Sequence, residues 1–138
     1  MGISRIGVIW NASKPMGLDT VKRILYILEQ QHISYSTNAD LAQVISDESV
    51  QDNSNFKDCD ILVVFGGDGT ILRALDAAIP QDIPIFGVNL GRLGFLTEVE
   101  LDNVEQDIQL VLDGKYTIDE RMIMRIDGQD DEHFFALN

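Results

Sequence analysis

An apolar run that leads directly into a glycine-rich turn and then into a helical pattern constrains the fold of this chain more than any other segment. Residues 61–65 read Ile-Leu-Val-Val-Phe, residues 66–70 read Gly-Gly-Asp-Gly-Thr, and a helical pattern continues from Ile71. A short apolar run bounded by glycine is typical of a buried strand. The glycines let the backbone turn sharply and approach a ligand, and the free N–H groups of the following helix form a ready anion site.

The aspartate in the middle of this turn limits what the turn can bind. A carboxylate repels phosphate, so a simple phosphate cradle would not contain Asp68. The residue makes sense if it takes a proton from a hydroxyl group or holds a metal ion beside phosphates. The turn also lacks the lysine of a P-loop and is therefore not a Walker motif. Alone, Gly-Asp-Gly is a common structural turn, but the preceding strand and following helix favour a ligand-binding loop.

Strands and helices are expected to alternate along most of the chain. The expected strands cover residues 5–10, 33–37, 61–65 and 84–88, and the expected helices cover residues 18–31, 70–78 and 102–113. This alternation predicts an α/β fold with a doubly wound, mostly parallel sheet. The polar stretch 41–56 is interpreted as a loop with room for one short helix. Because ligands bind beyond the carboxyl ends of such strands, the loops at 66–70 and 89–97 should face one crevice.

Helix ends are also readable in the sequence. Thr70 is expected to cap the helix after the first glycine loop, or else to contact a phosphate. Asp102 followed by Glu105 has the spacing of a capping box, and Gly114 suits the end of the same helix.

The pattern changes after Gly114. Residues 122–126 and 133–137 are apolar runs that flank a polar turn, which predicts a β-hairpin. The second run is strongly apolar and stops at Asn138. We therefore expect an α/β domain over residues 1–118 and, over residues 119–138, the truncated start of a second, β-rich domain.

The charge of the chain excludes some classes of partner. Its formal net charge is −13, with 23 acidic and 10 basic residues. Nucleic acids and anionic membrane surfaces are bound mainly through basic residues, so neither is an expected partner. A phosphorylated ligand on such an acidic chain would need help from Mg²⁺ or from basic residues of another domain.

The cellular compartment is predicted from the cysteine content and the start of the chain. Cys59 is the single cysteine, so no intrachain disulfide forms, which fits a reducing cytosol. The sequence contains no apolar run of membrane-spanning length, and residues 1–6 lead into a strand rather than a signal peptide. A cytoplasmic location is expected.

The second glycine loop contains an aromatic candidate for ligand binding. Glycines at positions 91 and 94 permit close approach of the backbone, and Phe95 and Leu96 follow them. These two side chains could enclose an adenine or a sugar face, or they could belong to the core. The residues alone leave both interpretations open.

Together these segments resemble the motifs of the NAD kinase family. The glycine turn at 66–70 is similar to a motif that this family shares with diacylglycerol, sphingosine and phosphofructokinase relatives. Asn89-Leu90-Gly91 with the segment 93–98 resembles a second motif that is more specific to NAD kinases. Residues 136–138 resemble the start of a third motif, and residues 11–15 the loop after the family's first strand. The resemblance covers essentially the whole chain.

The resemblance implies a fold and an activity. It implies an α/β kinase domain followed by a β-sandwich domain that completes the NAD site. The reaction it implies is transfer of the γ-phosphate of ATP, or a phosphate of inorganic polyphosphate, to the adenosine-ribose 2′-hydroxyl of NAD, giving NADP. A divalent metal cation, Mg²⁺, is expected, although no residue is assigned as its ligand. A homo-oligomer, either a dimer or a tetramer, is expected for the full-length protein.

The resemblance also implies the site residues. Asp68 takes the role of general base, with Gly69 beside it in the NAD site. Asn138 matches an asparagine that contacts NAD, and Arg73 matches a basic position near the dinucleotide, although Arg73 can equally be an exposed helix charge. Phe95 completes the expected NAD-binding set. The glutamate that follows the family's asparagine is absent, so the 138-residue chain alone is expected to be inactive.

Three alternative functions were compared with this one. A lipid or sugar kinase shares the first motif, but the loop at 89–98 and the lack of a basic membrane face argue against it. A receiver-type signalling domain needs an acidic pair after the first strand, where this chain has Trp10-Asn11-Ala12. A nucleotide sensor without catalytic activity stays open.

Overall fold

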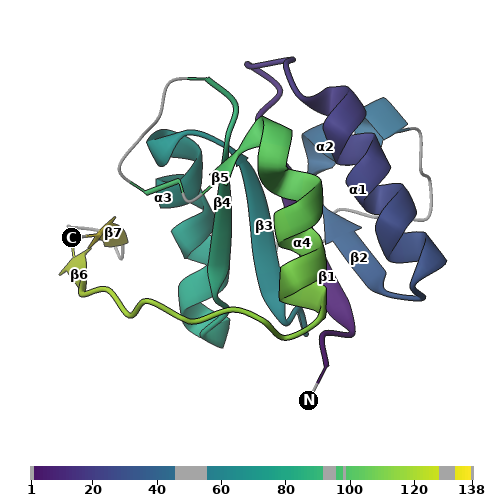
Figure 1. Cartoon of the computed structure of the whole chain (residues 1–138). Coiled ribbons are helices and arrows are strands. Elements are labelled where there is room, and N and C mark those ends of the chain that lie inside the picture. The colour runs from purple at the N-terminus through teal and green to yellow at the C-terminus, as the bar shows by residue number, and fades with distance from the viewer. Residues whose placement is uncertain (1, 46–55, 92–95, 98, 128–132, 138) are drawn as a thin grey trace.

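The computed structural model describes residues 2–45, 56–91, 96–97, 99–127 and 133–137, and Figure 1 shows how their elements are arranged. The elements in chain order are β1 (Arg5–Trp10), α1 (Leu18–Gln30), β2 (Ser34–Thr37), α2 (Ala39–Ile45), β3 (Ile61–Gly66), α3 (Asp68–Ala78), the 3₁₀ helix η1 (Ile79–Gln81), β4 (Ile85–Asn89), β5 (Val99–Glu100), the 3₁₀ helix η2 (Leu101–Asn103), α4 (Val104–Leu112), β6 (Ile123–Asp127) and β7 (His133–Leu137). No helix among these residues is long and apolar enough to cross a bilayer.

The first five strands form one parallel sheet in the order β2-β1-β3-β4-β5, which confirms the predicted α/β class. The chain runs from β1 outward to β2 and then returns to place β3 on the other side of β1. In sheets of this kind, ligands bind beyond the carboxyl ends of the strands where the direction of winding reverses. That switch point lies between β1 and β3, where Trp10 pairs with Phe65.

Helices cover both faces of the sheet. Helices α1 and α4 pack on one face, against Val63 and Phe65 of β3 among others, and they lie side by side in Figure 1. Helix α3 packs on the opposite face, against Leu62 and Val64. Every residue of β3 is therefore buried, which explains why its sequence is continuously apolar instead of alternating.

Two predicted helix caps are wrong. Helix α3 begins at Asp68 with Gly67 as its N-cap, so Thr70 lies inside the first turn and does not cap the helix. Residues 101–103 form η2, and α4 starts after Asn103 without a side-chain cap. Glu105 forms an ion pair with Arg23 of α1 instead of a capping box, because the packing of α4 beside α1 brings a cation within reach.

Other local predictions hold. Gly114 has a φ of +75°, as expected of a glycine that follows the end of a helix. The short helix within the polar stretch is α2, and residues 46–55 of that stretch lie outside the described residues.

The hairpin after the α/β unit is present. Strands β6 and β7 pair antiparallel, from Ile123 opposite Leu137 to Asp127 opposite His133, in a sheet separate from the first one. Residues 115–122, which lead to β6, have no regular secondary structure. The domain boundary between residues 118 and 119 stays a prediction.

Candidate functional site

The two glycine loops meet at the carboxyl edge of the sheet, as their positions in the sequence predict. Gly66 at the end of β3 pairs with Asn89 at the end of β4, and the N–H of Leu90 donates to the carbonyl of Gly66 at 3.0 Å. Further along, the N–H of Leu96 donates to Oδ1 of Asp68 at 2.9 Å. Leu96 of the second loop therefore lies against the start of α3.

Asp68 is held at the centre of this junction. It is the first residue of α3 and is half-buried. The positive end of the helix dipole stabilises negative charge at such a position. The hydrogen bond from Leu96 fixes how the carboxylate is turned. Asp68 is thus a fixed carboxylate that is still partly open to a ligand.

Glycine is required where the two loops pass closest to α3. A β-carbon on Gly66 would collide with the side chain of Thr70. A β-carbon on Gly87 would lie 2.6 Å from Cδ1 of Ile71 and 3.2 Å from Cα of Thr97. A larger residue at 87 would therefore require the end of the Ile71 side chain to move and would press on the backbone at Leu96 and Thr97 in the second loop.

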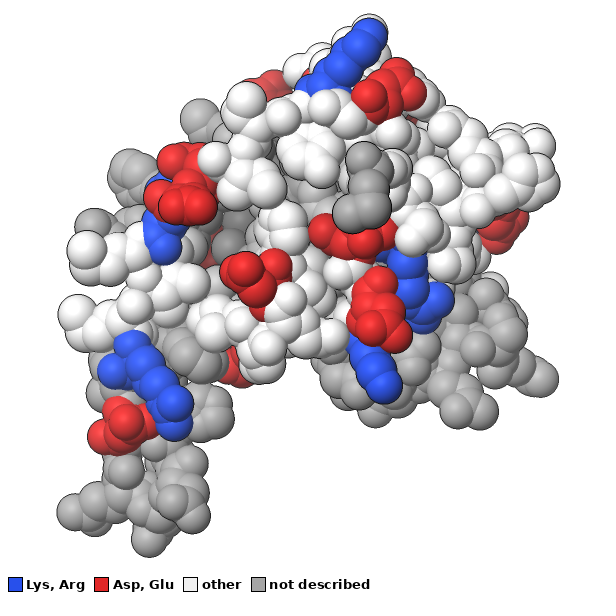
Figure 2. Space-filling view, turned by 90° about the horizontal axis from the view of Figure 1, so that it is seen from below, with Lys and Arg blue, Asp and Glu red and all other residues white. Residues whose placement is uncertain are grey.

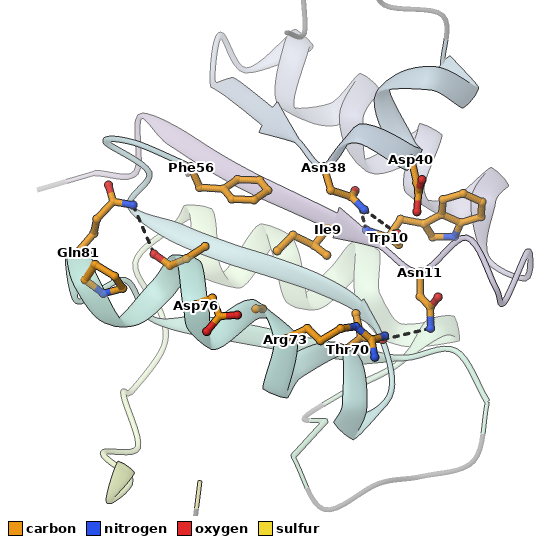
Figure 3. Close-up of a pocket in the computed structure, with 13 residues that line it drawn as sticks. Ile9, Trp10, Asn11, Asn38, Asp40, Phe56, Thr70, Arg73, Asp76 and Gln81 are labelled. Carbon is orange, nitrogen blue, oxygen red and sulfur yellow. Dashed lines mark hydrogen bonds between the residues drawn. The ribbon is translucent and has the colours of Figure 1, made fainter. Parts of the chain in front are cut away.

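Thr70 and Asn11 connect the first glycine loop to the end of β1. Oγ1 of the buried Thr70 accepts a hydrogen bond from Nδ2 of Asn11 at 3.2 Å, as Figure 3 shows. The backbone N–H of Asn11 donates to the carbonyl of Phe65 at 3.1 Å. Asn11 was not predicted as a site residue, although its place directly after the first strand and the resemblance of residues 11–15 to the NAD kinase loop there pointed to it.

Asn89 has a structural role at the start of the second loop. Its side chain is buried and bonds both polar groups of the Gly91 backbone: Oδ1 accepts from the N–H and Nδ2 donates to the carbonyl, each at 3.0 Å. These two bonds define the turn that follows β4.

Of the other predicted site residues, Gly69 directly follows Asp68 and Arg73 lies near Gly69. Gly69 is exposed, and a β-carbon there would be 3.7 Å from Nη1 of Arg73. Nη2 of Arg73 lies 3.4 Å from Oγ1 of Thr70. The predicted contacts through Phe95 and Asn138 fall outside the described residues.

Leu96 is partly buried against the core on the α3 side, which supports the core interpretation for this residue.

A cavity of about 540 Å³ opens beside the first glycine loop, between β1, α2 and α3 (Figure 3). Its lining comprises Ile9, Trp10, Asn11, Asn38, Asp40, Phe56, Thr70, Arg73, Ala74, Asp76, Ala77, Pro80 and Gln81. Thr70 belongs to both the cavity and the loop, and the side chains of Asn11 and Arg73, which also line the cavity, contact its hydroxyl group. The lining mixes apolar side chains with polar and charged ones, so the cavity beside the loop can hold a polar small molecule.

The described side chains do not assemble a metal cage. No group of three or more His, Cys, Asp or Glu residues is placed to hold a metal ion in the part of the chain that the structure describes.

Figure 2 views the molecule from the amino ends of the strands, opposite the glycine loops, and shows acidic and basic side chains interspersed. The charges on this face lie at the end of the strands opposite the glycine loops, so they are not part of the candidate site.

Comparison with known proteins relates most of the chain to one family. Residues 6–116 match the family model described as the ATP-NAD kinase N-terminal domain. The NAD kinase of Heliobacterium modesticaldum is 36% identical over 138 aligned residues, which cover 96% of this chain and 49% of the relative. The NAD kinase of Desulforamulus reducens is 34% identical over 124 residues, covering 88% of this chain and 43% of the relative. The chain thus spans about half the length of the curated relatives it matches.

Solved structures agree with the fold. Yeast NADH kinase, crystallised with NADH, superposes with a TM-score of 0.75 at 18% identity, covering 99% of this chain and 47% of that one. An NAD kinase from Archaeoglobus fulgidus in complex with ATP has a TM-score of 0.52 at 26% identity, covering 88% of this chain and 39% of that one.

Proposed function

The chain belongs to the NAD kinase family, and we propose that the full-length protein phosphorylates the adenosine-ribose 2′-hydroxyl of NAD to give NADP. The phosphate donor is ATP or inorganic polyphosphate. The observation that carries this proposal is the carboxylate of Asp68, fixed by Leu96 where two glycine loops meet beside a cavity. The related NAD kinase in complex with ATP supports ATP as one donor.

Asp68 is proposed as the general base. Its carboxylate takes the proton of the 2′-hydroxyl while the hydroxyl oxygen forms a bond to the terminal phosphorus of the donor. The bond between that phosphorus and its bridging oxygen breaks, and ADP or a shortened polyphosphate leaves with the bonding electrons. The proton on Asp68 then passes to solvent. A carboxylate held by the N–H of Leu96 is already oriented for this transfer, which reduces the entropic cost of the step.

The NAD-binding residues proposed here are Asp68, Gly69, Arg73, Phe95 and Asn138. Gly69 is exposed and has no side chain, so a ribose can approach the backbone next to the base. Arg73 places a guanidinium over Gly69, where it can contact a dinucleotide. Phe95 and Asn138 are included on the basis of the family resemblance.

The expected Mg²⁺ fits this donor set when most of its ligands come from the substrate. Mg²⁺ in kinases is held by one or two carboxylates together with substrate phosphates and water, and not by an all-protein cage. The described residues offer no such cage, and no side chain is assigned as a ligand of the ion. When bound, the ion would neutralise charge on the donor phosphates.

Residues 119–138 are proposed to begin a second, β-rich domain. In this region Met122, Ile123 and Met124 are 75%, 40% and 62% exposed, and a lone two-stranded hairpin is marginally stable at best. We therefore propose that the isolated 138-residue chain is inactive. We also propose, from the family resemblance, that the full-length protein works as a homo-oligomer. A cytoplasmic location is proposed with it, because the free thiol of Cys59 suits a reducing compartment.

The direct test is an assay of the purified full-length protein with NAD, Mg²⁺ and either ATP or polyphosphate. NADP is measured with an NADP-specific dehydrogenase. We expect NADP to accumulate with at least one donor, and the comparison of the two gives the donor preference. Binding of NAD and ATP without any NADP would support the sensor alternative and overturn the proposal.

A further inference from the structure

Lys14 lies over the gap between the two glycine loops. Its Nζ is 3.4 Å from the position that a β-carbon on Gly67 would occupy and 3.9 Å from the corresponding position at Gly91. Gly67 follows β3 and Gly91 follows β4, so one ammonium group faces both loops. Because neither residue has a side chain, the backbone of each can approach a group that is bound beside the ammonium group.

The loop that carries Lys14 is tied to the site at several points. The N–H of Lys14 donates to the carbonyl of Asn11 at 3.0 Å, and Oδ1 of Asn11 accepts from both the N–H and the hydroxyl of Ser13. Asn11 is in turn bonded to Phe65 and Thr70. The backbone of Lys14 is therefore held relative to the end of β3.

The other end of this loop is also fixed. Gly17 has a φ of +80°, and a β-carbon there would lie 2.6 Å from Cδ2 of Leu90, at the end of β4. The loop is consequently held against both strands whose glycine loops Lys14 faces. The fold therefore fixes the position of the Lys14 backbone, from which the ammonium group reaches both loops.

The charge on Lys14 is available to a ligand. The side chain is exposed, and none of the ion pairs formed among the described residues uses it. A phosphate site requires positive charge, and on a chain with a net charge of −13 Lys14 supplies a cation near the proposed base. Lysine is a common phosphate ligand that acts as a compact point charge.

We propose that Lys14 binds the terminal phosphate of the phosphate donor, between Gly67 and Gly91; this inference rests on the proposed function. Gly67 immediately precedes Asp68, so a phosphate held by Lys14 lies next to the base. The phosphate that must reach the base is the one being transferred. The pyrophosphate of NAD is separated from the accepting 2′-hydroxyl by the ribose, which makes it the weaker candidate.

The test uses the full-length protein and two probes, ATP and inorganic tripolyphosphate, titrated by calorimetry without NAD. Lys14→Met removes the charge at similar length, and Lys14→Arg keeps the charge. Lys22→Met, an exposed position on α1, is the matched control. A lost charge-assisted contact should weaken binding of both probes about 10- to 100-fold in Lys14→Met, with Lys14→Arg closer to the wild type.

A separate titration with NAD distinguishes the two possible phosphate sources. We expect the dissociation constant for NAD to be unchanged in Lys14→Met, while the KM for the donor rises. Unchanged binding of both probes would overturn the proposal, and so would a loss confined to NAD. Melting temperatures of all variants check that each one folds.

The outcomes also separate this inference from the proposed function. If the wild-type protein makes no NADP, the proposed function fails, yet tripolyphosphate binding still tests Lys14. If NADP is made and Lys14→Met behaves like the control, only the role of Lys14 fails.

Discussion

The N–H of Leu96 donates a hydrogen bond of 2.9 Å to Oδ1 of Asp68, across 28 residues of sequence. This bond connects the two glycine loops, which follow different strands, at the point where the proposed base lies. The orientation of the base therefore depends on the second loop. A change that displaces this loop should alter catalysis without touching Asp68.

Asp68→Asn should lower turnover about 10²- to 10⁴-fold, the usual contribution of general acid–base catalysis, while NAD affinity changes far less. The amide retains an oxygen that can accept the bond from Leu96, so the loop junction should survive. Steady-state kinetics and NAD titration on the full-length protein measure the two effects. Asp82→Asn is the matched control, because Asp82 is exposed and has a φ of +53°, which asparagine tolerates. Near-normal turnover in Asp68→Asn would contradict the role of base.

Gly87→Ala should destabilise the protein by about 1–3 kcal/mol, the usual cost of overpacking a core. The new methyl group would press on Ile71 and on the backbone at Thr97, and so move the second loop away from Asp68. Urea unfolding measures the stability, and turnover should fall with it. Gly2→Ala is the control, since nothing lies within 4 Å of a β-carbon there. Equal stability of the two variants would show that the loop adapts without cost.

Thr70→Val should cost about 1–3 kcal/mol, because it leaves the amide of Asn11 without its acceptor at nearly the same side-chain volume. Thr70→Ser keeps the hydroxyl and should lose less. The free energy of unfolding in urea compares the two variants. If serine and valine destabilise the protein equally, the hydroxyl is not what holds Asn11.

Asp60 should make stability dependent on pH in the acidic range. Burial raises the pKa of Asp60, but hydrogen bonds from the N–H of Ser4, the N–H of Arg5 and the hydroxyl of Ser4 outweigh it and lower the pKa. A group whose folded-state pKa is lowered stabilises the protein above its unfolded-state pKa. That contribution is lost as the pH falls through the folded-state pKa.

Asp60→Asn should therefore be less stable than the wild type at neutral pH. The difference should shrink once the pH falls below the ordinary aspartate pKa, about 3.9, and continue to shrink through the lower folded-state value. Melting temperatures of both proteins across this range measure it, with Asp82→Asn repeated as the control. A difference that is constant with pH would mean that the charge of Asp60 is not involved.

Local patterns in the sequence were sufficient to predict the class of fold and the edge of the sheet at which the candidate site lies. The continuous apolar run of β3 required burial on both faces, and that in turn required helices on both sides of a parallel sheet. Glycine loops after β3 and β4 then had to meet at one edge of that sheet. These conclusions depend on local patterns, which the sequence displays directly. Asp68 was predicted as a site residue from the glycines, strand and helix around it in the sequence. Arg73 was predicted only from the resemblance to NAD kinases.

The side-chain contacts of the candidate site could not be predicted from the sequence. The bonds from Leu96 to Asp68 and from Asn11 to Thr70 join residues 28 and 59 positions apart. Their formation depends on the order and register of the strands, which no local pattern specifies. The same reason explains why the two helix caps were predicted wrongly. Glu105 pairs with Arg23 on α1, and Thr70 bonds Asn11 after β1, and both contacts depend on tertiary packing. The position of Lys14 beside the two glycine loops has the same origin, because the loop that carries it follows β1 and β1 pairs with β3.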